Sequence, residues 1–324
     1  MKLFESLAEV PADFGPSAVS IGKFDGVHAG HRRVLAELRA VADAAELSAV
    51  AVTFDRNPLS VLRPDLCPDP LVSNPQKLEL LEATGIDATL MLHFDRAFSE
   101  QSPREFATSV LSGALNARIV FVGSDFRFGA KGAGTVEILE QLGAELGFDV
   151  RLIDAVVAPV GSEQRRASST WVRELLAEGR VTEAATVLGR APSIRSVVVG
   201  GVQRGRELGY PTANLAHGAE GFIPADGVYA ARVLIDGTSY GAAVSVGNNP
   251  TFEGVPDKTV EAHVLDESFD LYGKTVELFF IDYIRPMKKF EDADALVAQM
   301  HRDEEKIRSI LDQPHPSEPG RRRG

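Results

Sequence analysis

A chain of 324 residues is long enough for two domains, and its 25% charged and 44% hydrophobic residues are typical of a soluble globular protein. The formal net charge of −12 argues against a general nucleic-acid surface, and a single cysteine excludes an intramolecular disulfide and a thiolate metal cluster. No apolar run is long enough to span a bilayer and the acidic N-terminus is a poor signal peptide, so we expect a cytoplasmic protein.

The first informative segment, Ile21 to His31 (IGKFDGVHAGH), lies between a predicted strand and a predicted helix. The helix is indicated by apolar residues that recur on one face, namely Val34, Leu35, Leu38, Val41 and Ala42. Helix N-termini hold unpaired amide donors and a partial positive charge, which favour phosphates. Gly26 and Gly30 let the backbone approach a ligand closely. The junction therefore predicts a phosphate site.

Two histidines are the candidate side chains of that site. His28 and His31 are one helical turn apart, so both can point at the same phosphate chain. The alternative is that they are two surface histidines in a loop.

The first half of the chain alternates strand-like and helix-like segments. Buried strands are predicted at 48–54, 118–122 and 150–157, and helices at 76–84, 103–115 and 135–146. This alternation predicts an α/β fold, a parallel sheet with helices on both faces. Ligands of such sheets bind at the carboxyl ends of the strands, which is where the histidine segment falls.

Two later segments also fit a nucleotide site. Gly123 to Gly129 (GSDFRFG) follows a predicted strand, and Asp125 could hold a ribose or a second substrate with Arg127 close by; the alternative is a turn capped by Asp125. Lys131 begins a glycine-containing loop that we expect to act as a mobile lid.

Ser168 to Arg173 (SSTWVR) marks another helix start. Hydroxyl groups at such a position cap a helix in any protein, which is the alternative for Ser169 and Thr170. Arg173, one turn into the helix, could reach phosphates together with them.

The predicted elements become β-strands after about residues 189–196. The strands cover 196–199, 227–235, 239–246, 259–265 and 275–284, with turn signals between them, and predict an antiparallel barrel or sandwich. A final amphipathic helix at 293–311 is expected to close the fold with Leu296, Met300, Ile307 and Leu311 inward. We place the domains at 1–186 and 187–312 and expect a disordered tail at 313–324.

Leu208 to Asn214 (LGYPTAN) is the informative segment of the second half. Thr212 and Asn214 alternate as strand residues do, so their side chains share a face. A hydroxyl and an amide oxygen suit a hard cation such as Mg²⁺, which also binds ATP oxygens. The alternative is a β-turn capped by the same two residues. Upstream, a glycine-rich basic loop could cradle phosphates with Gly200, Gly201, Arg204, Gly205 and Arg206.

Glu261 is the acid inside an apolar β-run, with His263 two residues on and on the same face. A partly buried carboxylate is a candidate general base. The alternative is an edge-strand acid that faces water.

Taken together, the motifs resemble the bacterial bifunctional riboflavin kinase/FMN adenylyltransferase (FAD synthetase) family. GxFDGxHxGH, VGxDFRFG and SSTxxRE follow the layout of its adenylyltransferase module, and LGYPTAN, ADGVYA, VGNNPTF and VEAHVLDxxxDLYG that of its riboflavin kinase module. The resemblance covers about Ala18 to Leu311. It implies a Rossmann-like nucleotidyltransferase domain followed by a small antiparallel β-barrel with a closing helix.

For the first module, the resemblance implies adenylylation of FMN by ATP, giving FAD and pyrophosphate. Under that reading His28 and His31 steady the triphosphate, and Ser169, Thr170 and Arg173 grip the pyrophosphate. The ATP site then also includes Gly22, Phe24, Asp25, Gly26 and Gly30, while Asp125 and Arg127 bind the flavin. The family usually reads FxPHP where this chain has FDRNP (54–58), and Ile where it has Ala167.

For the second module, the resemblance implies phosphorylation of riboflavin by ATP. Thr212 and Asn214 would bind Mg²⁺ and ATP, and Glu261 would activate the ribityl 5′-hydroxyl for attack on the γ-phosphate. The loop with Gly200, Gly205 and Arg206 would close over ATP, although Val202 stands where another glycine is expected. The expected partners are riboflavin, FMN and ATP, without nucleic acid or membrane.

Two alternatives stay open at this point. Only the kinase module could be active, because FDRNP departs from the family pattern, or the chain could be a non-catalytic paralogue that binds flavin or nucleotide. The sequence also leaves the oligomeric state open, a homo-oligomer included.

Overall fold

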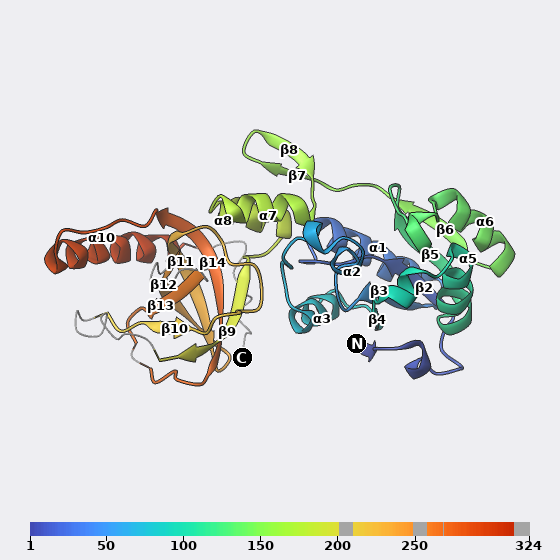
Figure 1. Ribbon diagram of the computed structural model, residues 1–324, viewed down its shortest axis with the longest axis horizontal. Coiled ribbons are helices and arrows are strands. Elements are labelled where there is room, and N and C mark those ends of the chain that lie inside the picture. Colours follow the sequence, from blue (N-terminus) through green and yellow to red (C-terminus); the bar gives the residue numbers. More distant parts are fainter. Residues whose placement is uncertain (201–209, 249–257, 268, 314–324) are drawn as a thin grey trace. The chain divides into compact units, whose positions relative to one another are not determined.

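The computed structural model describes residues 1–200, 210–248, 258–267 and 269–313, and the chain divides into two compact units, Met1–Val157 and Ala158–Gly324 (Figure 1). Each unit has its own sheet and its own core. Among the described residues, no helix is both long and apolar enough to cross a membrane.

The first unit is built on a six-stranded parallel sheet in the order β1-β4-β3-β2-β5-β6. Its strands are β1 (Lys2–Phe4), β2 (Ser17–Ile21), β3 (Ser48–Phe54), β4 (Ala88–Leu92), β5 (Ala117–Gly123) and β6 (Asp149–Ile153). Its α-helices are α1 (Ala29–Ala44), α2 (Leu59–Leu62), α3 (Asn74–Glu82), α4 (Arg96–Ser99), α5 (Pro103–Phe106) and α6 (Val136–Leu146). A π-helical segment, η3 (Ala107–Ala114), continues α5, and short 3-10 turns are η1 (Leu7–Glu9), η2 (Pro64–Leu66) and η4 (Ala130–Gly132).

Successive strand side chains point to opposite sides, and in the central strands β2, β3 and β4 both sides are buried. On one face, Ala18 and Ala49 pack with Leu35 and Leu38 of α1. On the other face, strand valines pack with η3 and α6, as Val19 and Val50 do with Leu139 and others. The predicted parallel sheet with helices on both faces is confirmed.

The chain order of the strands reverses between β2 and β5, which are neighbours in the sheet. Strands β3, β4 and β1 lie on one side of β2, while β5 and β6 lie on the other. Ligands of open parallel sheets bind at such a switch point, outside the carboxyl ends of the strands. The histidine segment follows β2 and GSDFRFG follows β5, so the fold brings the starts of both segments to this point.

The second unit holds a closed antiparallel barrel in the order β10-β13-β12-β11-β14-β9 (Figure 1). Its strands are β9 (Ser193–Val199), β10 (Ala213–Leu215), β11 (Gly227–Ile235), β12 (Thr238–Asn248), β13 (Lys258–Val264) and β14 (Thr275–Arg285). The turn between β11 and β12 is Asp236-Gly237 with φ of 48° and 83°, the left-handed pair that a two-residue hairpin needs. Of the two predicted architectures, barrel and sandwich, the barrel is confirmed.

Helices α7 (Ser169–Ala177), α8 (Val181–Leu188) and α10 (Ala293–Leu311) complete the second unit. The hydroxyl group of Thr182 on α8 donates to the carbonyl of Ile281 on β14, and the guanidinium of Arg232 donates to Leu311 O at the end of α10 (2.6 Å). Ile307 and Leu311 are buried as predicted, whereas Leu296 and Met300 are half-buried.

The predicted strand at 150–157 is wrong as a single element. The apolar run is divided between β6, in the parallel sheet, and β7 (Val157–Val160), which pairs only with β8 (Glu163–Arg166) in the described structure. An apolar run does not show where one strand ends and the next begins when the two strands pair with different partners. The predicted tail at 313–324 lies outside the described residues apart from its first position, and the domain limit at 186 stays a prediction.

Candidate active sites

The loop that follows β2 is anchored at both its backbone and its side chains. Gly22 N donates to Val52 O of β3 (3.0 Å), and the hydroxyl group of Thr53 donates to Lys23 O (3.1 Å). Phe24 and Val27 have left-handed φ values of 47° and 38°, which are strained for residues with these side chains, and both are 1% exposed. Core packing of these two side chains therefore holds the backbone in a conformation that the local sequence alone disfavours.

This anchored loop presents the two histidines together. His28 is the N-cap of α1, it is 7% exposed, and its Nδ1 accepts from His31 N (3.4 Å). The two imidazole rings stack with centroids 3.8 Å apart. Because Nδ1 of His28 accepts, the proton of the neutral ring is on Nε2. The surface-loop alternative is wrong for His28, and the phosphate role of the pair stays a prediction.

Asp25 has a structural contact that the sequence did not indicate. Its Oδ1 accepts from Leu71 N (2.9 Å) in the segment that leads to α3. On α3, Lys77 is buried and donates from Nζ to Phe54 O at the end of β3 (2.8 Å). Burial lowers the pKa of Lys77, while the negative charges of Asp25 and Asp55 oppose that shift. A lysine on the buried face of an amphipathic helix was the available sequence signal for this residue.

The segment that departs from the family pattern, FDRNP, is an ordered turn after β3. Asp55 Oδ1 accepts from Phe94 N (2.9 Å), its Oδ2 lies 2.8 Å from His93 Nδ1, and Arg56 pairs with it at 3.0 Å. Burial opposes the shift, but these hydrogen bonds lower the pKa of Asp55. The carboxylate thus joins the carboxyl ends of β3 and β4.

Asn57, which stands at the position of the family histidine, has a local role. Its Oδ1 accepts from Leu59 N (3.1 Å) and so forms the turn at the start of α2. The sequence comparison alone could not show this use of the side chain.

The segment after β5 places Asp125 and Arg127 at the surface of the first unit. Phe126 and Phe128 between and beside them stack with ring centroids 5.5 Å apart. Phe128 also forms an isolated β-bridge with Gly134, and η4 lies between the two. The segment that we expected to be a mobile lid therefore has regular hydrogen bonds, while the roles of Asp125 and Arg127 stay predictions.

The helix start at α7 is capped by Ser168, whose hydroxyl group accepts from Trp171 N (3.2 Å). Ser169 and Thr170 occupy the first turn and Arg173 the second. These residues belong to the second compact unit and the histidines to the first. Their joint action on one pyrophosphate therefore stays a prediction.

In the barrel, the predicted metal and base residues are brought together by strand pairing. Asn214 on β10 stands opposite Glu261 on β13 in the antiparallel register. Thr212, directly before β10, has its Oγ1 3.5 Å from Glu261 Oε2. All three side chains are half-buried. The turn alternative is wrong for Asn214, which belongs to a strand, and the edge alternative for Glu261 is wrong because β13 lies between β10 and β12.

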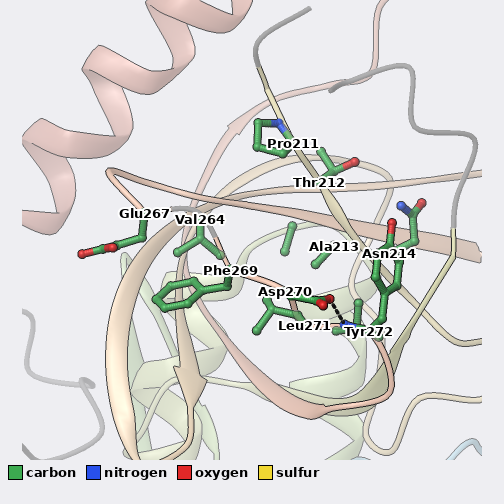
Figure 2. A pocket seen from close by; sticks show the side chains of 12 residues that line it. Pro211, Thr212, Ala213, Asn214, Val264, Glu267, Phe269, Asp270, Leu271 and Tyr272 are labelled. Carbon is green, nitrogen blue, oxygen red and sulfur yellow. Dashed lines mark hydrogen bonds between the residues drawn. The ribbon is translucent and has the colours of Figure 1, made fainter. Parts of the chain in front are cut away.

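Thr212 and Asn214, but not Glu261, line a cavity of about 600 Å³. Figure 2 shows Thr212 and Asn214 on one side of it and Glu267 and Phe269 on the other. The lining residues are Val198, Pro211, Thr212, Ala213, Asn214, Ala262, Val264, Glu267, Phe269, Asp270, Leu271 and Tyr272. The sequence indicated the 267–272 side only as part of a longer motif. A mixed run of acids and aromatics after a strand was the available signal.

The oxygen donors at this cavity fit a hard divalent cation. The hydroxyl of Thr212 and the amide oxygen of Asn214 are ligands of the kind that Mg²⁺ takes when water and phosphate complete its shell. Elsewhere in the described ranges, no three His, Cys, Asp or Glu side chains form a metal cluster. Of the glycine-rich loop, Gly200 is exposed, whereas Gly201, Arg204, Gly205 and Arg206 lie outside the described residues.

Comparison with known proteins identifies two modules in the chain. The FAD synthetase family matches residues 10–171 and the riboflavin kinase family matches residues 188–311. Bifunctional riboflavin kinase/FMN adenylyltransferase of Escherichia coli K12 is 34% identical over 287 residues, covering 88% of this chain and 90% of the relative. The Haemophilus influenzae protein of that name is 32% identical over 317 residues, covering 96% and 99%.

A solved structure described as a macrolide-efflux protein from Streptococcus pneumoniae has the same fold. It is 33% identical, with a TM-score of 0.85, and the alignment covers 94% of this chain and 98% of that one. The prediction that one chain combines the two modules is confirmed by the two family matches and the curated relatives. With its histidine loop at the sheet switch point and its Thr-Asn-Glu set on the barrel, the chain belongs to the bifunctional riboflavin kinase/FMN adenylyltransferase family.

Proposed function

We propose that the barrel unit phosphorylates riboflavin to FMN and that the parallel-sheet unit, with α7, adenylylates FMN to FAD, one ATP being used at each step. The observation that carries the kinase assignment is the register pair Asn214–Glu261 with Thr212 beside it. Thr212 and Asn214 of this set also line the 600 Å³ cavity. The stacked pair His28–His31 at the switch point carries the adenylyltransferase assignment.

In the kinase step, Glu261 acts as general base. Its carboxylate accepts the proton of the ribityl 5′-hydroxyl as the hydroxyl oxygen forms a bond to the γ-phosphorus of ATP, and the bond from that phosphorus to the β,γ-bridging oxygen breaks to release ADP. Thr212 and Asn214 orient the triphosphate. When bound there, Mg²⁺ neutralises charge on the transferred phosphoryl group. Positioning supplies most of the rate, because phosphoryl transfer needs little covalent help from the protein.

In the adenylyl step, a terminal phosphate oxygen of FMN attacks the α-phosphorus of ATP and pyrophosphate leaves. His28 donates from Nε2 to the triphosphate, and His31 stacks on it within the same anion site. Ser169, Thr170 and Arg173 hold the departing pyrophosphate. Asp125 and Arg127 contact the flavin substrate. No covalent enzyme intermediate is required, so catalysis depends on donors already aimed at developing charge.

The test is a chromatographic time course of the purified chain with riboflavin, ATP and Mg²⁺. FMN that appears first and FAD that follows are the expected result. FMN without FAD, also when FMN is supplied directly, would support a kinase with a silent first unit. Tight flavin binding without either product would support the non-catalytic alternative.

We place the protein in the cytoplasm, in keeping with its single cysteine.

A further inference from the structure

Tyr210 links the segment before β10, which carries Thr212, to the closing helix α10. Tyr210 is 7% exposed, and its hydroxyl group lies 2.8 Å from His301 Nδ1 and 3.5 Å from Glu304 Oε2. Its ring also meets the His301 ring at 70°, with centroids 5.6 Å apart. His301 and Glu304 are three positions apart on one helix face, so a single tyrosine hydroxyl group can contact both.

The strand that carries Glu261 is fastened to the same helix. Arg308 of α10 forms a bidentate ion pair with Asp266 (2.5 and 2.8 Å), which lies two residues after the end of β13. Arg308 also donates to Glu304 at 2.6 Å. These charges are partly exposed and contribute little to global stability. Their geometric effect is to orient Glu304 toward Tyr210 and to link the end of β13 with the start of β10.

A third contact joins β13 to the segment that precedes β10. His263 Nδ1 lies 2.9 Å from Pro211 O. A carbonyl oxygen only accepts, so Nδ1 of His263 carries the proton and donates. The Tyr210 ring packs edge-on against the His263 ring with centroids 5.1 Å apart. Pro211, between Tyr210 and Thr212, is thus held from both sides.

The Thr212–Glu261 pair is too loose to set its own geometry. Its 3.5 Å separation is at the outer limit of a hydrogen bond, where the interaction is weak. The relative position of the two side chains must therefore come from what holds their strands. For Thr212, that is the sequence neighbour Tyr210 and its bonds to α10.

We propose that Tyr210 is a positioning residue of the kinase site, which acts by fastening Thr212 and the strand β10 to α10 through His301 and Glu304. The inference rests on the proposed function of the barrel. The hydroxyl group of Tyr210 contacts His301 and Glu304 of α10, so Tyr210 acts through Thr212 and not on substrate. Burial and the negative charge of Glu304 raise the pKa of Tyr210, so its hydroxyl group keeps the proton that it donates.

The test compares Tyr210→Phe, which keeps the buried ring and removes only the hydroxyl group, with the wild-type chain. We expect kcat for FMN formation to fall about tenfold, since a small misplacement of a positioning group is costly. The KM for riboflavin should stay within about twofold, because uniform binding is not removed. FAD formation from supplied FMN, measured on the same sample, should be unchanged.

A second variant provides an independent test if Tyr210→Phe folds poorly. His301→Ala lies at an exposed position and should give the same loss, and the double variant should lose no more than either single one, because both act through one hydrogen bond. Glu305→Gln, exposed on the same helix, is the matched control that should keep wild-type kcat.

Three results would overturn the inference. They are an unchanged kcat in Tyr210→Phe, a parallel loss of both half-reactions, and a double variant whose loss is the product of the single losses. If the wild-type chain forms no FMN at all, the proposed function fails and this inference fails with it. An active wild type with an equally active Tyr210→Phe variant overturns the inference alone.

Discussion

Replacing Glu261 by glutamine separates the two proposed reactions most cleanly. Glutamine has the size of glutamate and can keep the contact with Thr212, and the β13 backbone pairs with Asn214 and Ser245 whatever the side chain is. The substitution therefore removes a negative charge and a proton acceptor and leaves the barrel closed. A positioned general base contributes roughly 10² to 10⁴ in rate. At 1.36 kcal/mol for each factor of ten, this is about 3 to 5 kcal/mol of activation free energy.

The assay follows each half-reaction by chromatography on one preparation of Glu261→Gln. FMN formation from riboflavin should fall by the factor given above, while FAD formation from supplied FMN stays at the wild-type rate. Because Glu261 lies in the second compact unit and the two histidines lie in the first, loss of the glutamate charge need not impair the histidine pair. FMN formation within tenfold of wild type would refute the role of Glu261 as base. A matching fall in FAD formation would show that the variant damages the whole chain.

Three further outcomes are expected. His31→Ala should lower FAD formation from FMN by about 100-fold or more, with FMN formation within twofold, and equal losses would contradict separate sites. Although burial of the carboxylate opposes this shift, the pKa of Asp55 is lowered by hydrogen bonds from Phe94 and Arg56. Asp55 therefore stabilises the fold above about pH 4, and this stabilisation is lost as the pH falls through the lowered pKa. The Tm of Asp55→Asn should accordingly lie below that of wild type at pH 7 and converge with it in strong acid; a constant difference would argue against the assignment. Gly134→Ala would place a methyl group 2.5 Å from a buried aromatic ring and should cost about 1–3 kcal/mol, so an unchanged urea midpoint would mean that the ring moves aside.

Elements whose limits are indicated by turn residues or by an apolar stripe could be predicted closely from the sequence. The strand Gly227–Ile235 and the helix Ala293–Leu311 match their predicted limits, the first because Asp-Gly ends it and the second because an apolar stripe runs along it. The barrel could not be told from a sandwich. Its closure depends on β10, three residues that pair with both β9 and β13, and so short a strand has no periodicity of its own.

The site residues divide in a similar way. Motifs located His28, Thr212 and Glu261. His28 caps the helix that follows β2, Thr212 directly precedes β10, and Glu261 lies within β13. The contacts that hold these residues could not be predicted, since they join distant positions. Lys77 reaches the end of β3, 23 residues earlier, and Tyr210 reaches α10, 91 residues later.

The FDRNP segment bears on whether the first unit is active. Its three distinctive side chains are used in building an ordered turn: Asp55 binds the chain after β4, Arg56 binds Asp55, and Asn57 starts α2. The histidine loop is supported elsewhere, through the contacts of Thr53 and Asp25 with other segments. A change at 56–57 therefore leaves these contacts of the histidine loop in place. Under the proposed function, we expect such a change to alter the KM for FMN and not to abolish FAD formation, because the motifs at His28, His31 and α7 follow the family layout.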